Sequence, residues 1–124
     1  MELHLVHFKT EYGNDIGAAI GAGAKQRADD SLAVLGIFFE IQKDDNKALE
    51  PMMNALDEIA TKDLNTKVKM QSASLATLLP SDTKNFYRYM GSLTTPGCNQ
   101  IVVWTVFKVF FKKRNFLQKE RQTF

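Results

Sequence analysis

The feature that most constrains the fold is a turn that leads directly into an apolar strand late in the chain. Tyr89–Cys98 reads Tyr-Met-Gly-Ser-Leu-Thr-Thr-Pro-Gly-Cys, and Ile101–Phe107 then holds the single tryptophan, Trp104. Proline and glycine favour turns, whereas the β-branched and aromatic residues after them favour a strand. A Ser-Leu-Thr-Thr-Pro run is also too particular to be a generic turn. The sequence therefore predicts a specialised turn followed by a strand of the core.

A second strand is predicted at the start of the chain. Residues Glu2–Phe8 alternate, so that Glu2, His4 and Val6 share one face with Phe8. Both faces carry apolar residues, which is typical of a strand covered on both sides of its sheet. A buried polar group needs a partner, and Glu2 and His4 are placed to supply each other.

The remaining elements complete a fold that is mainly β with peripheral helices. The apolar run Leu32–Ile41 predicts a central strand, and Asn46–Ala60 predicts a helix from its apolar spacing. Thr10–Asp30 is rich in glycine, which favours loops with one short helical turn beginning at Ala18. Ser74–Leu79 predicts another short helical turn before Pro80.

Length and composition fit one small soluble domain. The chain has 124 residues, of which 44% are hydrophobic and 24% are charged. The sequence has no apolar run of membrane-spanning length and no visible export signal after its first residue. These features exclude neither an enzyme nor a binding module.

Taken together, the motifs resemble the C-terminal part of an α-class carbonic anhydrase, a zinc enzyme that hydrates carbon dioxide. Five pieces occur in the family's order: Glu-Leu-His-Leu-Val-His from Glu2, Tyr12-Gly13, Leu32–Phe38, Leu78-Leu79-Pro80, and the turn with its tryptophan strand. The resemblance implies a partial domain over residues 1–108, with an incomplete twisted central sheet. It also implies that the N-terminal half of the domain is missing from the chain.

The resemblance assigns a role to each matching residue. His4 matches the third zinc ligand, and Glu2 matches the carboxylate that accepts the other N–H of that imidazole. Thr94 matches the residue that orients the zinc-bound hydroxide, with Thr95 beside it. Zn²⁺ is the implied cofactor, and carbon dioxide and bicarbonate are the implied substrates. The apolar substrate pocket is expected to be lined by Val6, Val34, Leu93, Val102 and Trp104.

The sequence departs from the family at several positions that matter for catalysis. The His-x-His pair that supplies the other two zinc ligands is absent, and His4 and His7 are the two histidines of the chain. The proton-shuttle histidine and the glutamate that partners Thr94 are also absent. We therefore expect a truncated fragment that is inactive alone, whose parent hydrates carbon dioxide reversibly. The alternative is a non-catalytic carbonic-anhydrase-related binding module.

Cys98 indicates where the parent protein functions. Secreted and membrane-bound members of the family pair a cysteine after the Thr-Thr-Pro turn with one near the domain's N-terminus. Cys98 is the single cysteine here, so an idle thiol is the competing interpretation. The resemblance favours an extracellular or membrane-associated parent, with the disulfide partner in a segment outside this chain.

Residues 109–124 are expected to be a basic tail that does not belong to the family. From Lys108 to Phe124 the chain carries six Lys or Arg residues and one Glu. The segment could form a basic amphipathic helix with Phe110, Phe111 and Leu117 on one side, which would allow weak contact with a membrane surface. A tail that binds nucleic acid is a weaker alternative, and we expect no nucleic-acid partner.

Overall fold

The computed structural model describes residues 2–44, 46–63, 65–70 and 74–114. It divides the chain into two compact units. The first unit comprises residues 1–39 and 81–110, and the second comprises residues 40–80 and 111–124. Each unit is described below by itself.

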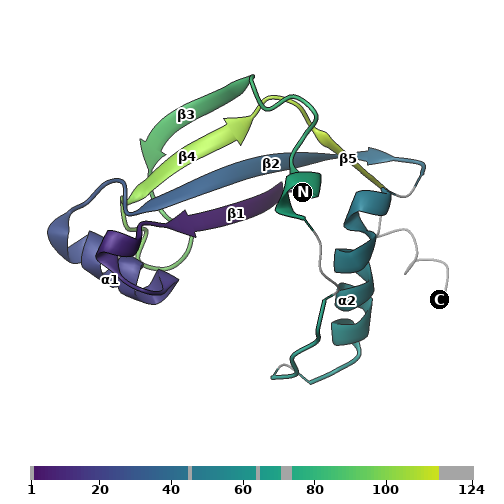
Figure 1. The fold of residues 1–124 in the computed structure, drawn as a ribbon, viewed down its shortest axis with the longest axis horizontal. Coiled ribbons are helices and arrows are strands. Elements are labelled where there is room, and N and C mark those ends of the chain that lie inside the picture. The colour runs from purple at the N-terminus through teal and green to yellow at the C-terminus, as the bar shows by residue number, and fades with distance from the viewer. Residues whose placement is uncertain (1, 45, 64, 71–73, 115–124) are drawn as a thin grey trace. The chain divides into compact units, whose positions relative to one another are not determined.

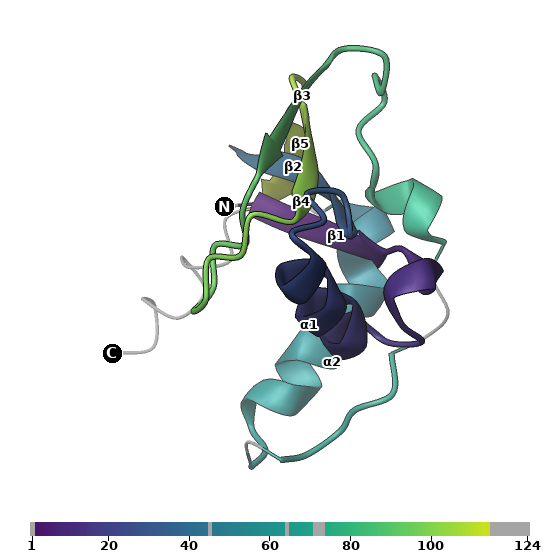
Figure 2. The same cartoon turned by 90° about the vertical axis from the view of Figure 1, so that its left-hand side faces the viewer.

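The first unit contains a four-stranded mixed sheet whose strands follow the order β1-β2-β4-β3. Figure 1 shows these strands side by side, and Figure 2 views them from the end where α1 lies. β1 pairs antiparallel with β2, β2 pairs parallel with β4, and β4 pairs antiparallel with β3. This mainly β architecture confirms the predicted fold class. The elements are β1 (Glu2–Phe8), η1 (Thr10–Tyr12), α1 (Ile16–Gln26), β2 (Leu32–Gln42, in this unit as far as Phe39), β3 (Phe86–Gly91) and β4 (Val102–Phe107).

The strand register places the chemically interesting side chains on one face of the sheet. His4 pairs with Gly36, and Gly36 pairs with Val106. Because side chains alternate along a strand, Glu2 and Trp104 lie on this same face. We call it the His4 face.

One end of the His4 face is closed by α1. The helix begins after Asp15, whose carboxylate accepts a hydrogen bond from the Ala18 N–H at 2.8 Å. It is longer than the short turn expected from its glycines, because small residues let it approach the sheet closely. A Cβ added at Gly23 would lie 2.7 Å from the Ser31 Cβ. The buried cluster at this end comprises Ala19, Leu32, Val34, Ile101, Val102 and Trp104.

β1 is less covered than the sequence indicates. It stands at one end of the strand order, and its residues are exposed or half-buried. Val6, for example, is 43% exposed. The alternation of Glu2–Phe8 correctly predicts a strand, but the cover expected over both faces is not provided by the described residues.

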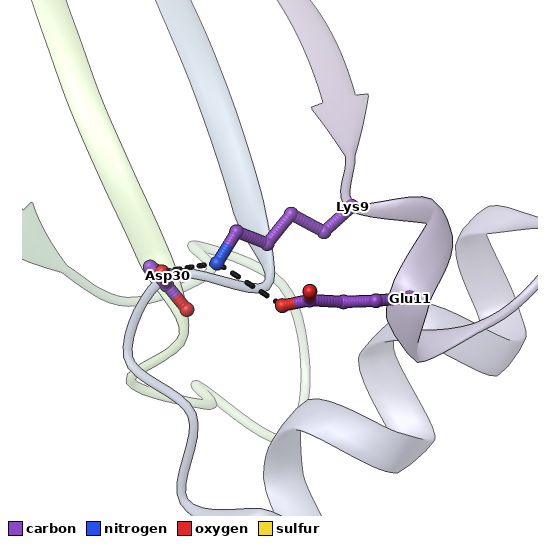
Figure 3. A network of polar contacts seen from close by, with 3 residues as sticks. All are labelled: Lys9, Glu11 and Asp30. Carbon is purple, nitrogen blue, oxygen red and sulfur yellow. Dashed lines mark hydrogen bonds and ion pairs between the residues drawn. The ribbon is translucent and has the colours of Figure 1, made fainter.

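A lysine between two carboxylates ties the end of β1 to the start of β2 (Figure 3). The Lys9 Nζ lies 2.5 Å from an Asp30 carboxylate oxygen and 3.2 Å from a Glu11 carboxylate oxygen. The hydrogen bond from Lys9 lowers the pKa of Asp30, and the hydrogen bonds to Asp30 and Glu11 raise the pKa of Lys9. The Lys9 backbone N–H also donates to the Ser31 carbonyl at 3.0 Å.

The second unit contains η2 (Lys47–Leu49), α2 (Glu50–Ala60), η3 (Leu75–Leu78) and β5 (Phe111–Arg114). Pro51 lies in the first turn of α2, as expected from its fixed φ angle and missing N–H. The expectation of a basic helix in the tail is wrong for residues 111–114, which form a strand, and residues 115–124 lie outside the described residues. The strand is favoured over a helix because an isolated short helix has marginal stability in water and because phenylalanine has a high strand propensity.

Candidate functional site

A pocket of about 340 Å³ opens on the part of the His4 face that α1 leaves uncovered. A volume of this size is at the lower end of the range for small-molecule sites. All of its lining residues belong to the first unit. They are Glu2, His4, Gly36, Phe38, Tyr89, Gly91, Ser92, Thr94, Trp104 and Val106.

The His4 imidazole is oriented by its neighbour on the same strand. The His4 Nε2 lies 3.3 Å from a Glu2 carboxylate oxygen. An ionised carboxylate only accepts hydrogen bonds, so the nitrogen that faces it carries the proton. The tautomer assigned by this contact therefore leaves the lone pair on Nδ1.

Trp104 forms the aromatic centre of the pocket. Its ring meets the His4 ring edge to face, with centroids 4.9 Å apart and planes at 74°. On the neighbouring strand β3, the Tyr89 ring lies nearly parallel to the Trp104 ring, with centroids 6.4 Å apart. The indole Nε1–H donates to the Ser92 carbonyl at 3.0 Å, which fixes the ring. Gly91 leaves room for the indole ring in this position, because a Cβ at residue 91 would lie 2.9 Å from the Trp104 Cδ1.

The Thr-Thr-Pro turn brings Thr94 to the same pocket. The Leu93 N–H donates to the Asn99 carbonyl at 3.0 Å, and the Cys98 N–H donates to the Thr95 carbonyl at 3.0 Å. Cys98 has a φ of 43°, in the left-handed region that non-glycine residues seldom adopt. Its thiol is free and exposed. The turn is thus fixed by its own backbone hydrogen bonds, which hold Thr94 in place.

The structure brings together some of the predicted site residues and separates others. Glu2, His4, Thr94 and Trp104 line one pocket. Thr95 is exposed and is not among the lining residues. The other predicted pocket residues lie nearer the α1 end: Val34 and Val102 are in the buried cluster, Leu93 packs against it, and Val6 is partly exposed on the His4 face.

Six lining residues were missed by sequence reasoning. Gly36 and Phe38 continue the Val34 face of β2, Tyr89 and Gly91 lie on β3, Ser92 follows them, and Val106 follows Trp104 on β4. Period-two spacing from Val34 and Trp104 would have found Gly36, Phe38 and Val106. Gly36 matters because its missing side chain leaves open the space between His4 and Val106.

The described residues do not by themselves fit a complete zinc site. Catalytic zinc takes three protein ligands and an open position for water. Within the described parts of the chain, no three His, Cys, Asp or Glu side chains are grouped so that they could hold a metal ion. His4 offers one imidazole nitrogen, already oriented by Glu2. The site therefore has the donor chemistry of one ligand out of three.

The pocket thus brings together an imidazole beside a carboxylate, the Thr-Thr-Pro turn and the tryptophan strand. A sequence model of the family described as "Eukaryotic-type carbonic anhydrase" matches residues 1–122. The chain belongs to this family. The match includes most of the segment from residue 109 onward, whose separate origin stays a prediction.

Several relatives align with most of this chain but with only part of their own length. "Carbonic anhydrase 4" of Oryctolagus cuniculus is 40% identical over 112 residues, covering 87% of this chain and 33% of the relative. "Carbonic anhydrase 4" of Mus musculus is 35% identical over 122 residues, covering 95% and 36%. "Carbonic anhydrase 15" of Mus musculus is 34% identical over 110 residues, covering 87% and 32%. The chain thus spans about a third of the length of these relatives.

None of the helices in the described parts of the chain is both long and apolar enough to cross a bilayer.

Proposed function

We propose that this chain supplies one side of the active site of a zinc-dependent carbonic anhydrase, which interconverts carbon dioxide with bicarbonate and a proton. The observation that carries the proposal is the meeting of Glu2, His4, Thr94 and Trp104 in one pocket. Membership of the carbonic anhydrase family supports it. Because the described residues provide one metal-binding imidazole, the other ligands must come from residues outside this set.

Each residue of the chain has a defined task under this proposal. Glu2 accepts the Nε2–H of His4 and leaves Nδ1 as a basic ligand atom. Thr94 presents a hydroxyl that orients the nucleophile. The hydrogen bonds of the turn hold this hydroxyl in position before the reaction begins. Trp104 gives the pocket an apolar surface, which suits a substrate without strong hydrogen-bonding groups. The zinc, when bound, lowers the pKa of its water to about 7, for which carbonic anhydrase is the standard example.

A chimera tests the proposal directly. Residues 1–108 of this chain would replace the matching segment of the rabbit relative, and hydration of carbon dioxide would be followed by stopped flow with zinc present. We expect zinc-dependent activity well above the uncatalysed rate. His4→Ala should abolish it by removing a ligand, and Thr94→Val should lower kcat by roughly a hundredfold through lost orientation.

The control variant is Thr95→Val, whose side chain lies outside the lining of the pocket. It should retain most of the activity. A folded chimera that binds zinc but shows no hydration, or one in which Thr94→Val matches Thr95→Val, would contradict the roles assigned here.

The chain alone, in contrast, should be inactive. A single oriented imidazole binds zinc only weakly, because high affinity at this class of site requires several ligands acting together. The purified chain with added zinc should show the same hydration rate as its His4→Ala variant. Zinc-dependent activity that disappears in the variant would show that the chain is self-sufficient.

The incomplete ligand set favours one alternative, a carbonic-anhydrase-related binding module without catalysis. Under this alternative the pocket binds a molecule and converts nothing. The segment of a longer protein that would precede residue 1 decides between the enzyme and the binding module. An intact His-x-His pair there supports the enzyme, and substituted positions support the binding module.

We further propose an extracellular or membrane-associated location for the whole protein. The exposed free thiol of Cys98, held at a turn, is placed to form a disulfide with a cysteine outside this chain. Thiol labelling of the native longer protein tests this. A protected Cys98 that becomes reactive only after reduction supports it, whereas ready labelling argues for a reducing compartment.

A further inference from the structure

One buried side chain connects the imidazole of the pocket to the turn that carries Thr94. Trp104 is 7% exposed, and its ring meets the His4 ring edge to face with centroids 4.9 Å apart. The Nε1–H of the same indole donates a hydrogen bond to the Ser92 carbonyl at 3.0 Å, two residues before Thr94. A shift of this ring would therefore change its contacts with the imidazole and with the turn together.

The sheet fixes the two ends of the turn, and the indole fixes a point within it. Gly91 and Val102 pair with each other as the last residue of β3 and the first residue of β4. Between them, the Leu93 N–H donates to the Asn99 carbonyl, which joins residues of the turn to one another. The bond from the Trp104 Nε1–H instead joins the turn to a side chain of the sheet. It therefore limits how far the turn can move relative to the sheet.

The indole ring is itself held in one place. Trp104 pairs with Val34 on β2 and with Tyr89 on β3. The Tyr89 ring lies nearly parallel to the indole, with an angle of 13° between the planes. A Cβ at residue 91 would lie 2.9 Å from the Trp104 Cδ1 and 3.4 Å from its Nε1, so the ring can occupy this place only beside a glycine. The ring is thus a fixed reference for the groups that contact it.

We propose that Trp104 is a positioning residue, whose indole N–H sets the position of the Thr94 hydroxyl relative to the His4 imidazole. This inference rests on the proposed function, in which His4 binds zinc and Thr94 orients the nucleophile. The indole has a single N–H, and the Ser92 carbonyl already accepts it, so the N–H acts on the turn and not on the substrate. Because a misplacement of about 1 Å can lower a rate by about a hundredfold, a bond that holds the turn contributes to the chemical step.

The position of the turn is tested first in the full chain, without catalysis. Trp104→Phe keeps an aromatic ring and removes the N–H donor. Amide hydrogen exchange at Leu93 and Cys98, whose N–H groups donate within the turn, should become about tenfold faster. The control is the Lys9 N–H, which donates to the Ser31 carbonyl between β1 and β2 and should change little. Unchanged exchange at the turn, or an equal increase at Lys9, would overturn the proposal.

The catalytic consequence is tested in the chimera described above. Trp104→Phe should lower kcat by about tenfold and change KM by less than about twofold, because the indole N–H does not contact the substrate. In a Thr94→Val background the same substitution should lower kcat by less than about twofold, because it acts through the Thr94 hydroxyl. In a Thr95→Val background it should keep its full effect. An equal loss of kcat in both backgrounds would show that Trp104 acts only as an apolar wall or through stability, and would overturn the proposal.

A second variant displaces the indole without removing it. Gly91→Ala adds a Cβ that would overlap the Trp104 ring, and it should reproduce the loss of kcat and its dependence on Thr94. Gly21→Ala is the control, because a Cβ there meets nothing within 4 Å. Equal kcat values for these two glycine variants would contradict the proposal. A chimera that is inactive before any substitution contradicts the proposed function instead, and the exchange comparison in the full chain still decides whether the indole holds the turn.

Discussion

The two ends of the His4 face use the same strands for opposite purposes. At the α1 end, Leu32 and Val102 are completely buried and belong to the cluster that includes Ala19. At the other end, Gly36 leaves a gap and the polar pair of Glu2 and His4 remains accessible. Trp104 belongs to both ends. The difference shows that cover by one helix, rather than the composition of the strands, decides which part of the face is core and which part is a site.

The largest expected effect comes from shortening a side chain at the closed end. Leu32→Ala should destabilise the first unit by about 2–5 kcal/mol, because it removes buried methyl groups and leaves a cavity. Val6→Ala is the matched change on the same face at a side chain that is 43% exposed, and it should cost less than about 1 kcal/mol. Urea unfolding followed by Trp104 fluorescence measures both. Similar losses would mean that the two regions do not differ in cover.

The second effect tests the close contact between α1 and the sheet. Gly23→Ala should destabilise by about 1–3 kcal/mol, because its Cβ would overlap the Ser31 side chain. Gly21→Ala is the control in the same helix, where an added Cβ meets nothing within 4 Å. It should stabilise by about 0.5–1 kcal/mol through better helix propensity. If both variants were stabilising, α1 could not be packed as closely as described.

A third effect concerns the residue that joins the two ends. Trp104→Phe keeps an aromatic ring but removes the Nε1–H that donates to the Ser92 carbonyl. We expect a loss of about 1 kcal/mol from the broken hydrogen bond and the smaller ring. Circular dichroism would follow the unfolding, since the variant lacks the fluorescent probe. An unchanged midpoint would show that this hydrogen bond does not hold the turn against the sheet.

These comparisons also explain what the sequence could and could not predict. Alternation along Glu2–Phe8 correctly predicts β1, and it correctly places Glu2 and His4 within reach of each other. Period-two spacing assigns a side chain to a face but not to a position along it. The family resemblance assigned Val34 and Val102 to the substrate pocket. Both lie in the buried cluster with Ala19 of α1, and their part in the pocket stays a prediction.

The helix α1 was underestimated for a related reason. Four glycines in Thr10–Asp30 indicate a loop when only local propensity is considered. The helix forms because Ala19 and Gly23 pack against the sheet at a distance that larger residues would not allow. Tertiary contact of this kind is not visible in local sequence. The strand at Phe111–Arg114 was missed for the same reason, because a basic aromatic segment suits a helix or a strand equally well without its neighbours.

The smallest expected effect comes from the ion pairs that join β1 to β2 at the closed end. Lys9 lowers the pKa of Asp30, so the folded state favours the ionised carboxylate. A carboxylate with a lowered folded pKa stabilises the fold above its unfolded pKa, and this contribution is lost as pH falls through the folded value. The raised pKa of Lys9 limits the ion pair at high pH, because the stabilisation by the charged amine is lost as pH rises through its folded pKa.

Asp30→Asn should therefore lower the urea midpoint slightly at neutral pH and by less at about pH 3. The side chains are 45% and 41% exposed, so added salt should shrink the difference further. Asp57→Asn, the same change on α2 in the second unit, serves as the control, since Trp104 should report no shift of the first unit from it. An Asp30→Asn effect that stayed constant from neutral to acidic pH would show that the carboxylate acts through packing and not through its charge.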